Sequence, residues 1–444
     1  MARGCDGGER NASAGAPSGA ARSAARRGAV GWIHGVLLGA SVWLWFTAAQ
    51  AVEIQPAPRA PTISVLTFGP GDETFSKFGH DAIWVSDPRQ PAERRDWVFN
   101  YGTFRFDSPW LIMDFLKGRL SYWLSVSSLD RTLAGYRSAN RSVSAQQLDI
   151  PPDTARAITA FLYENAKPEN AHYRYDYYRD NCATRIRDVI DRHVDGQLAV
   201  AARGPAQLTY RQHTRRLTVD SPFLYFGLDL AMGPLIDQPV TEWEEMFLPA
   251  KVEAGLAAAT NARGVPLVKA RRVLFEAQRP PARETAPGFG WGWLAIGVAS
   301  GGVLYGLARV RRRWSEMTLA AGLGLFGGLG GILGSLLLVL WLLTDHDVTY
   351  WNHNVLCCPV WLLALPVLAY DYGRREPRRG IWMARLVGAA TISTGVALLL
   401  QVSGLGRQDT VPALSVFFPM WLGAGLAVWE RHQRPLPAWA KLPK

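Results

Sequence analysis

The pattern of apolar and polar positions divides the chain into two parts. Residues 55–276 alternate short apolar runs with polar turns, whereas nearly every position after Gly288 is apolar, with many Gly and Trp residues. A helix needs about 20 apolar residues to cross a bilayer. Five stretches of this kind are present, at 289–308, 317–343, 355–370, 381–402 and 410–429. The pattern predicts a folded domain at 55–276, a Pro-rich tether at 277–288 and a transmembrane bundle at 289–429.

Shorter runs in the first part predict an α+β domain. Apolar, β-branched and aromatic residues between turn residues are typical of strands. Five strands are expected, at 62–68, 79–85, 97–101, 120–127 and 141–150. Helices are expected from Ser108 to about Lys117, from Asp153 to Ala166, and around Cys182. For the helix at Cys182, Asp180 suits the N-cap, which places the cysteine among the first unsatisfied amides.

The first 51 residues have the layout of a secretory signal. Arg22, Arg26 and Arg27 precede an apolar run at 30–48, and Ala49-Gln50-Ala51 follows it. Basic, apolar and small residues in this order predict export, with cleavage after Ala51. The apolar run is also nearly long enough to span a bilayer, so an uncleaved N-terminal anchor is the alternative.

The net charge of +11 comes largely from this leader and from short segments beside the spans. Basic clusters lie at 309–313 and 374–379 and in the tail at 430–444, whereas the other two loops carry a single Arg between them. Cytoplasmic loops are enriched in Lys and Arg. We therefore expect the folded domain outside and the C-terminus in the cytoplasm. A nucleic-acid partner would require a basic stripe on a folded surface, and is excluded.

The cysteines are Cys5, Cys182, Cys357 and Cys358, so no disulfide can form within the folded domain. A lone Cys with a His elsewhere in the chain is a candidate nucleophile–base pair, here Cys182 and His80. At the start of a helix, the dipole would lower the pKa of the thiol, and backbone amides could stabilise an oxyanion. The alternative is a small core residue on the apolar stripe of that helix.

His80 follows Gly79 at the start of a predicted strand, on one face with Ala82 and Trp84. Asn100 could hold the imidazole in one tautomer as a third member, with Asp96 as the second choice. A purely structural His80 is the alternative. The aromatic run at 173–178 is expected to pack around the site rather than react.

The loop at 344–354 is dense in polar groups at the predicted membrane edge. It could be a hydrated connector, a wall of the active site, or a docking surface for a polar lipid headgroup. A metal site at His346 and His353 is a weaker hypothesis, because no further ligand spacing supports it.

Several sequence strings together resemble one bacterial family, that of the Lnb-type periplasmic domain attached to lipoprotein N-acyltransferases. The resemblance covers about residues 60–250, and the loop ending at Asn354 and the multi-span tail also resemble full-length members. The strings that carry it are Leu66-Thr67-Phe68-Gly69-Pro70-Gly71-Asp72, Phe78-Gly79-His80, Phe99-Asn100-Tyr101-Gly102-Thr103-Phe104, Asn165-Ala166-Lys167-Pro168-Glu169-Asn170, Tyr173-Arg174-Tyr175-Asp176 and Asp180-Asn181-Cys182-Ala183-Thr184-Arg185.

The resemblance implies a circularly permuted papain-like thiol fold, an antiparallel sheet with helices, with His before Cys, as in lecithin:retinol acyltransferase-like enzymes. It implies that Cys182 and His80, with Asn100, pass an acyl chain from phospholipid through a thioester to the amine of a lipidated N-terminal cysteine of a lipoprotein. Such an enzyme would sit in the bacterial inner membrane with its catalytic domain in the periplasm. Thioesters react readily with amines, so no metal or nucleotide cofactor is expected.

Two other functions stay open on the sequence. One is a membrane-anchored cysteine hydrolase of the cell wall, an amidase or peptidase with the same pair and water as acceptor. The other is a non-catalytic binding module of the envelope. Fold alone does not decide among the three.

Overall fold

The computed structural model describes residues 59–104, 113–114, 116–119, 121–261, 263–373 and 377–433. The predicted leader at 1–51, the predicted helix start at Ser108, and most of the tail after residue 433 lie outside the described residues. So does much of the basic cluster at 374–379.

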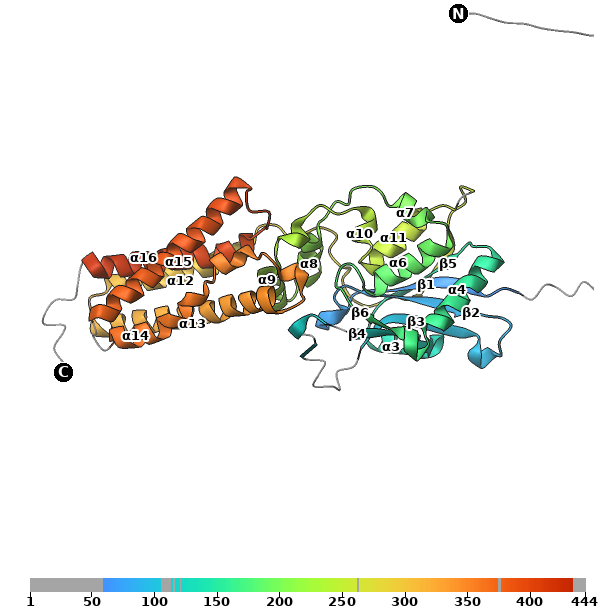
Figure 1. The fold of residues 1–444 in the computed structure, drawn as a ribbon, viewed down its shortest axis with the longest axis horizontal. Coiled ribbons are helices and arrows are strands. Elements are labelled where there is room, and N and C mark those ends of the chain that lie inside the picture. Colours follow the sequence, from blue (N-terminus) through green and yellow to red (C-terminus); the bar gives the residue numbers. More distant parts are fainter. Residues whose placement is uncertain are drawn as a thin grey trace, which may run out of the picture. The chain divides into compact units, whose positions relative to one another are not determined.

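The folded domain is built on a seven-stranded antiparallel sheet in the order β6-β4-β3-β2-β1-β5-β7 (Figure 1). Its strands are β1 Thr62–Phe68, β2 His80–Ser86, β3 Asp96–Thr103, β4 Ser121–Ser128, β5 Val143–Leu148, β6 His172–Arg174 and β7 Val268–Phe275. The first five confirm the predicted strands. The two outermost, β6 and β7, were not predicted, because β6 is three residues long within the aromatic run and β7 is broken by Lys and Arg.

Nine α-helices accompany the sheet in the described part of this domain. They are α3 Leu129–Ser138, α4 Pro152–Asn165, α5 Pro168–Ala171, α6 Cys182–His193, α7 Gln197–Ala201, α8 Tyr210–Thr218, α9 Pro222–Ala231, α10 Glu242–Glu245 and α11 Pro249–Ala258. The predicted helices at 153–166 and around Cys182 are confirmed as α4 and α6.

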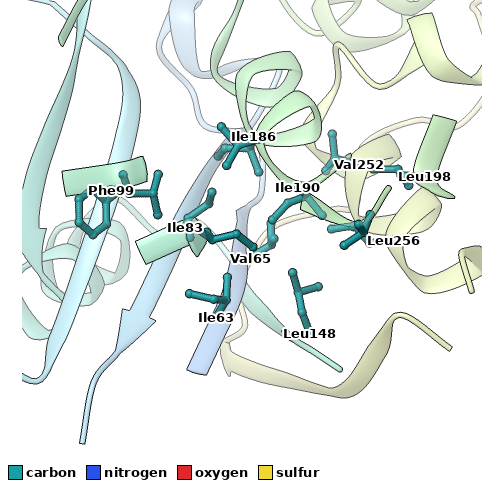
Figure 2. Close-up of a cluster of buried hydrophobic side chains, with 14 of the residues drawn as sticks. Ile63, Val65, Ile83, Phe99, Leu148, Ile186, Ile190, Leu198, Val252 and Leu256 are labelled. Atoms are coloured by element: carbon teal, nitrogen blue, oxygen red, sulfur yellow. The ribbon is translucent and has the colours of Figure 1, made fainter. Parts of the chain in front are cut away.

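The two faces of the sheet bury different helices, as the alternation along β2 shows. Ile83 and Val85 belong to a core shared with α4, α6 and α11, whereas Ala82 belongs to a second core shared with α3. In Figure 2, Ile83 lies close to Ile186 and Ile190 of α6. Fully burying an aliphatic side chain contributes about 1.5–3 kcal/mol, so this apolar stripe holds α6, and the cysteine at its start, against the sheet.

The C-terminal half contains five helical segments that are long and apolar enough to cross a membrane, in agreement with the five predicted stretches. They are Trp291–Arg309, Arg313–Leu343, His353–Asp371, Gly380–Ser403 and Val411–Gln433. The corresponding helices are α12 Trp291–Arg309, α13 Arg313–Leu343, α14 Leu365–Gly373, α15 Pro377–Ser403 and α16 Val411–Gln433; the third segment begins with the 3₁₀ turns η5 His353–Leu356 and η6 Val360–Ala364.

Helix α9 ends against the loops between the spans. The last carbonyls of a helix have no partner within it, and here side chains from the bundle supply one. Asn352 Nδ2 donates to Leu230 O at 2.8 Å and to Ala231 O at 2.9 Å, and Gln408 Nε2 donates to Met232 O at 3.0 Å. Asn352 is fully buried. The second half of the 344–354 loop, which contains Asn352, therefore joins the domain to the bundle and is not a hydrated connector.

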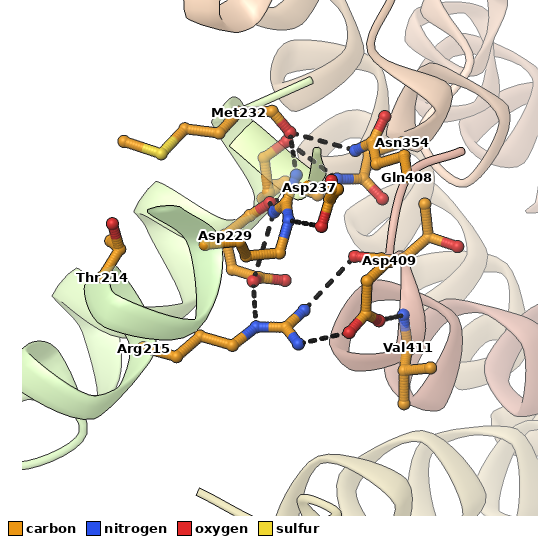
Figure 3. Close-up of polar contacts among 12 residues, drawn as sticks. Thr214, Arg215, Asp229, Met232, Asp237, Asn354, Gln408, Asp409 and Val411 are labelled. Carbon is orange, nitrogen blue, oxygen red and sulfur yellow. Dashed lines mark hydrogen bonds and ion pairs between the residues drawn. The ribbon is translucent and has the colours of Figure 1, made fainter. Parts of the chain in front are cut away.

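Ion pairs, buried except at the partly exposed Asp409, reinforce the same junction (Figure 3). Arg215 of α8 donates to Asp229 Oδ1 of α9 at 2.6 Å and to Asp409 Oδ2, in the loop before α16, at 2.5 Å. Arg211 pairs with the same Asp229 and with Asp237. The carboxylates neutralise the two guanidinium groups within this interface, which makes their burial tolerable.

Candidate active site

Cys182 is the first residue of α6, and Asn181 caps that helix. The Asn181 side chain accepts hydrogen bonds from the amides of Ala183 (2.9 Å) and Thr184 (3.0 Å), and Thr184 Oγ1 accepts one from the Asn181 amide at 2.8 Å. This is a capping box. The predicted cap, Asp180, is wrong: its carboxylate instead pairs with Arg185. Asn181 prevails because its amide nitrogen is also bonded within the fold, to Tyr177 O and Phe247 O.

The Cys182 thiol is half-buried where α6 meets the sheet. Burial raises its pKa to about 12, and the charge of Asp81 adds to the rise. Hydrogen bonds from backbone N–H groups, including those of Asp81 and Ala183, oppose it. The prediction of a lowered pKa is therefore wrong, because burial outweighs the amides at the start of the helix. The resting thiol is neutral and needs a base to become a nucleophile.

His80 is the first residue of β2 and lies on the face that it shares with Ala82. Its ring stacks on Phe68, with centroids 5.7 Å apart. Burial lowers the pKa of His80 to about 4, the charge of Arg141 lowers it further, and a side-chain hydrogen bond with Asn100 opposes both. The imidazole is therefore neutral near pH 7 and can accept a proton.

Gly102 explains how the two residues meet. The His80 side chain lies on one face of the sheet, and α6, which carries Cys182, packs on the other face. A side chain at the position of β3 between them would therefore separate His80 from Cys182. The pairing of Ile83 with Phe99, continued along the strands, brings Gly102 opposite His80. A Cβ added to Gly102 would lie 3.4 Å from Cys182 Cβ and 4.0 Å from His80 Cε1. The two side chains thus border one carbon-sized space that the glycine leaves open.

Asn100 is held in a position to orient the imidazole. Its Nδ2 donates to Val98 O at 3.3 Å and to Ser127 Oγ at 3.4 Å, which leaves the carbonyl oxygen for His80. Asp96, the second choice, accepts from the Trp84 indole at 2.9 Å and pairs with Ser86 at the far end of β2. The structure thus brings Cys182, His80 and Asn100 together and separates Asp96 from them. Their catalytic roles stay predictions.

Residues 50–216 match the family model of the Lnb N-terminal periplasmic domain. This part of the chain is therefore similar to that family. The match contains all three candidate residues. No curated protein and no solved structure matches the chain. With its five candidate spans, the chain is a membrane-anchored protein with a periplasmic Lnb domain.

Sequence reasoning missed one ionisable group of the Lnb domain beside the thiol. Asp81 is fully buried on the opposite side of β2 from His80, and neither of its carboxylate oxygens makes a well-formed hydrogen bond. The Thr67 hydroxyl is the neighbouring side chain that favours its ionised form. Burial raises the pKa of Asp81 well above its ordinary value. No local pattern marks Asp81, since a polar residue after a strand-borne His normally faces solvent.

A row of aromatic rings in the Lnb domain leads from the neighbourhood of Cys182 to the loops of the bundle. Tyr122 stacks on Tyr175 with centroids 4.1 Å apart, and Tyr175 contacts Tyr177 at 6.1 Å. Tyr177 in turn stacks on His346 at 6.1 Å. At the other end, Phe104 lies 5.0 Å from Tyr122. The aromatic run at 173–178 therefore packs around the site, as predicted, and also reaches the 344–354 loop.

A cavity of about 530 Å³ lies between this row and the loop. Its lining consists of Gly118, Arg174, Tyr175, Asp176, Tyr177, Asp180, Asp345, His346, Asp347, Val348 and Tyr350. Salt bridges cross from domain to loop, from Arg119 to Asp345 and from Arg179 to Asp347, both at 2.8 Å. The first half of the loop therefore forms one wall of this cavity. In the part of the chain that the structure describes, no three metal-ligating side chains gather around His346 or His353.

Proposed function

We propose that this protein is a membrane-anchored thiol acyltransferase, which moves an acyl chain from phospholipid through a Cys182 thioester to an amine. The acceptor amine would be that of the lipidated N-terminal cysteine of a lipoprotein. The observation that carries the proposal is the shared space at Gly102, which Cys182 and His80 both border. The order of His80 on β2 before Cys182 on α6 is also what a circularly permuted papain-like fold requires.

In the first step, His80 removes the thiol proton and the sulfur attacks the ester carbonyl carbon, so the carbonyl π pair moves to oxygen. The Cys182 amide, at the start of α6, supplies a hydrogen bond to this oxyanion. Collapse breaks the carbon–oxygen ester bond, and His80 returns its proton to the departing alcohol. In the second step, the acceptor amine attacks the thioester carbonyl carbon and loses a proton to His80. The carbon–sulfur bond then breaks, and His80 returns that proton to the departing Cys182 sulfur.

A lipid substrate is favoured by the surroundings of the pair. Five candidate spans hold the domain at a bilayer, and the aromatic row joins Tyr175, near the thiol, to His346 in a loop of the bundle. Rings of this kind provide an apolar surface along which an acyl chain can leave the membrane. The basic clusters support a cytoplasmic C-terminus and a catalytic domain on the periplasmic side.

The test is intact-mass analysis of the full chain in phospholipid vesicles. Wild type should gain one acyl mass that hydroxylamine removes and that a lipopeptide amine discharges. Cys182→Ser and His80→Ala should gain none. Asn100→Ala should be acylated more slowly, whereas Asp96→Asn, a matched change on the same strand, should behave as wild type.

Other outcomes would separate the competing functions. An adduct discharged by water but not by amine would identify a lipid hydrolase. Absence of an adduct, together with Cys182-dependent cleavage of peptidoglycan, would identify the wall hydrolase. Absence of both activities would support a binding module.

A further inference from the structure

Tyr173 carries a buried hydroxyl that makes no hydrogen bond. It is the middle residue of β6 and pairs with Tyr122 of β4. Its ring meets Tyr101 edge-on, with centroids 6.1 Å apart, while its Oη is buried without a partner. Buried donors are nearly always satisfied in folded proteins, so an unsatisfied one calls for an explanation.

The same hydroxyl borders the space that Gly102 leaves open. A Cβ at Gly102 would lie 3.9 Å from Tyr173 Oη, in addition to its contacts with Cys182 and His80. All three distances are ordinary van der Waals separations, so the space fits one carbon atom without displacing its neighbours. Gly102 has φ +88°, a conformation that disfavours any side chain there. A nucleophile, a base and a free donor therefore surround one position.

Arg185 adds positive charge above the Tyr173 ring. Its guanidinium carbon lies 4.1 Å from the ring centroid, and Asp180 holds the group in place through two hydrogen bonds. Burial raises the pKa of Tyr173, and Arg185 opposes that rise. The phenol thus keeps its proton, while the nearby cation makes the O–H a stronger hydrogen-bond donor.

We propose that Tyr173 Oη is the side-chain donor of the oxyanion hole and binds the oxygen of the tetrahedral intermediate formed at Cys182. This assignment rests on the acyl-transfer function proposed above. When sulfur bonds to the carbonyl carbon, the π pair moves to oxygen, and the phenol donates a hydrogen bond to that oxygen without losing its proton. The bond is released when the carbonyl reforms. The substrate carbonyl thus satisfies the orphaned hydroxyl.

The test compares two reactions at the same sulfur in the full-length protein. Acylation by p-nitrophenyl octanoate passes through an oxyanion, whereas alkylation by iodoacetamide does not. Tyr173→Phe should slow acylation of Cys182 by about 100- to 1000-fold, the usual effect of losing one such donor. Its alkylation rate, followed by peptide mass at Cys182, should equal that of wild type. Tyr163→Phe, an exposed tyrosine outside the site, should change neither rate.

Each alternative result has a definite meaning. Equal acylation of Tyr173→Phe and wild type would overturn the assignment. So would a parallel loss of acylation and alkylation, because Tyr173 would then act on the thiol itself. So would a wild-type Cys182 that is alkylated but never acylated by the ester. If the ester acylates Cys182 in a Tyr173-dependent way but phospholipid does not, the assignment stands and the phospholipid donor is wrong.

Discussion

Arg215 of the Lnb domain lies 2.5 Å from Asp409 of the bundle, and the same guanidinium lies 2.6 Å from the buried Asp229. One side chain therefore ties helices α8 and α9 to a loop between two spans. Together with Asn352 and Gln408, it fixes the domain at the membrane surface rather than leaving it on a flexible tether.

Removing Arg215 should therefore cost more than removing Asp409. Arg215→Ala leaves Asp229 with Arg211 as its remaining cation, and we expect a loss of about 3 kcal/mol, the low end for breaking a buried pair. Asp409→Ala should cost about 1 kcal/mol or less, because that carboxylate is partly exposed. Chemical unfolding and limited proteolysis near residue 215 would measure both. If both variants lost the same small amount of unfolding free energy, the Arg215 ion pairs would not be what holds the junction together.

The capping role of Asn181 predicts an effect on both stability and chemistry. Asn181→Ala removes the acceptor for two amides at the start of α6 and should destabilise the domain by about 1–2 kcal/mol. It should also slow Cys182 acylation, because the first turn positions the thiol. Asp180→Asn retains the cap and serves as the comparison, with the midpoint of thermal unfolding as readout. A larger loss for Asp180→Asn would restore Asp180 as the cap.

The raised pKa of the Cys182 thiol predicts the pH dependence of its alkylation. With a pKa of about 12, the thiolate fraction should grow about tenfold per pH unit across the neutral range. The iodoacetamide rate at Cys182 should follow that slope with no plateau. A plateau below about pH 7 would instead reveal a preformed thiolate–imidazolium pair, and His80→Gln would then abolish it.

Asp81 predicts a distinct pH dependence of stability. Its pKa is raised in the folded state, so the fold binds a proton that the unfolded chain releases above its ordinary pKa. The contribution of Asp81 to the free energy of unfolding is fully present below its ordinary pKa. It is lost at about 1.4 kcal/mol per pH unit as the pH rises towards the pKa of Asp81 in the folded state. Asp81→Asn should lack this loss and be more stable than wild type at pH 7. Denaturant unfolding of wild type and Asp81→Asn between about pH 4 and 8 measures this difference. If Asp81 were ionised in the folded state, the free energies of unfolding of the two proteins would vary with pH in parallel.

Local sequence patterns were sufficient for the main elements. Five strands, helix α4, helix α6 and five spans all follow from apolar periodicity and length, because each signal is contained within a few consecutive residues. Cys182 and His80 could be singled out by residue type and by their places at the starts of a helix and a strand. Residue type and place alone did not reveal Tyr173 or Gly102 as neighbours of the pair.

The tertiary structure decided what depends on residues far apart in the chain. Asn181 rather than Asp180 became the cap because Phe247 O, 66 positions away, binds its amide. The thiol pKa rose rather than fell because the sheet buries the start of α6. The single loop at 344–354 acquired two roles, one half bordering a cavity and the other closing α9. Sequence determined which residues can do chemistry, and packing determined which of them meet, since distance and burial arise only when distant segments are brought together.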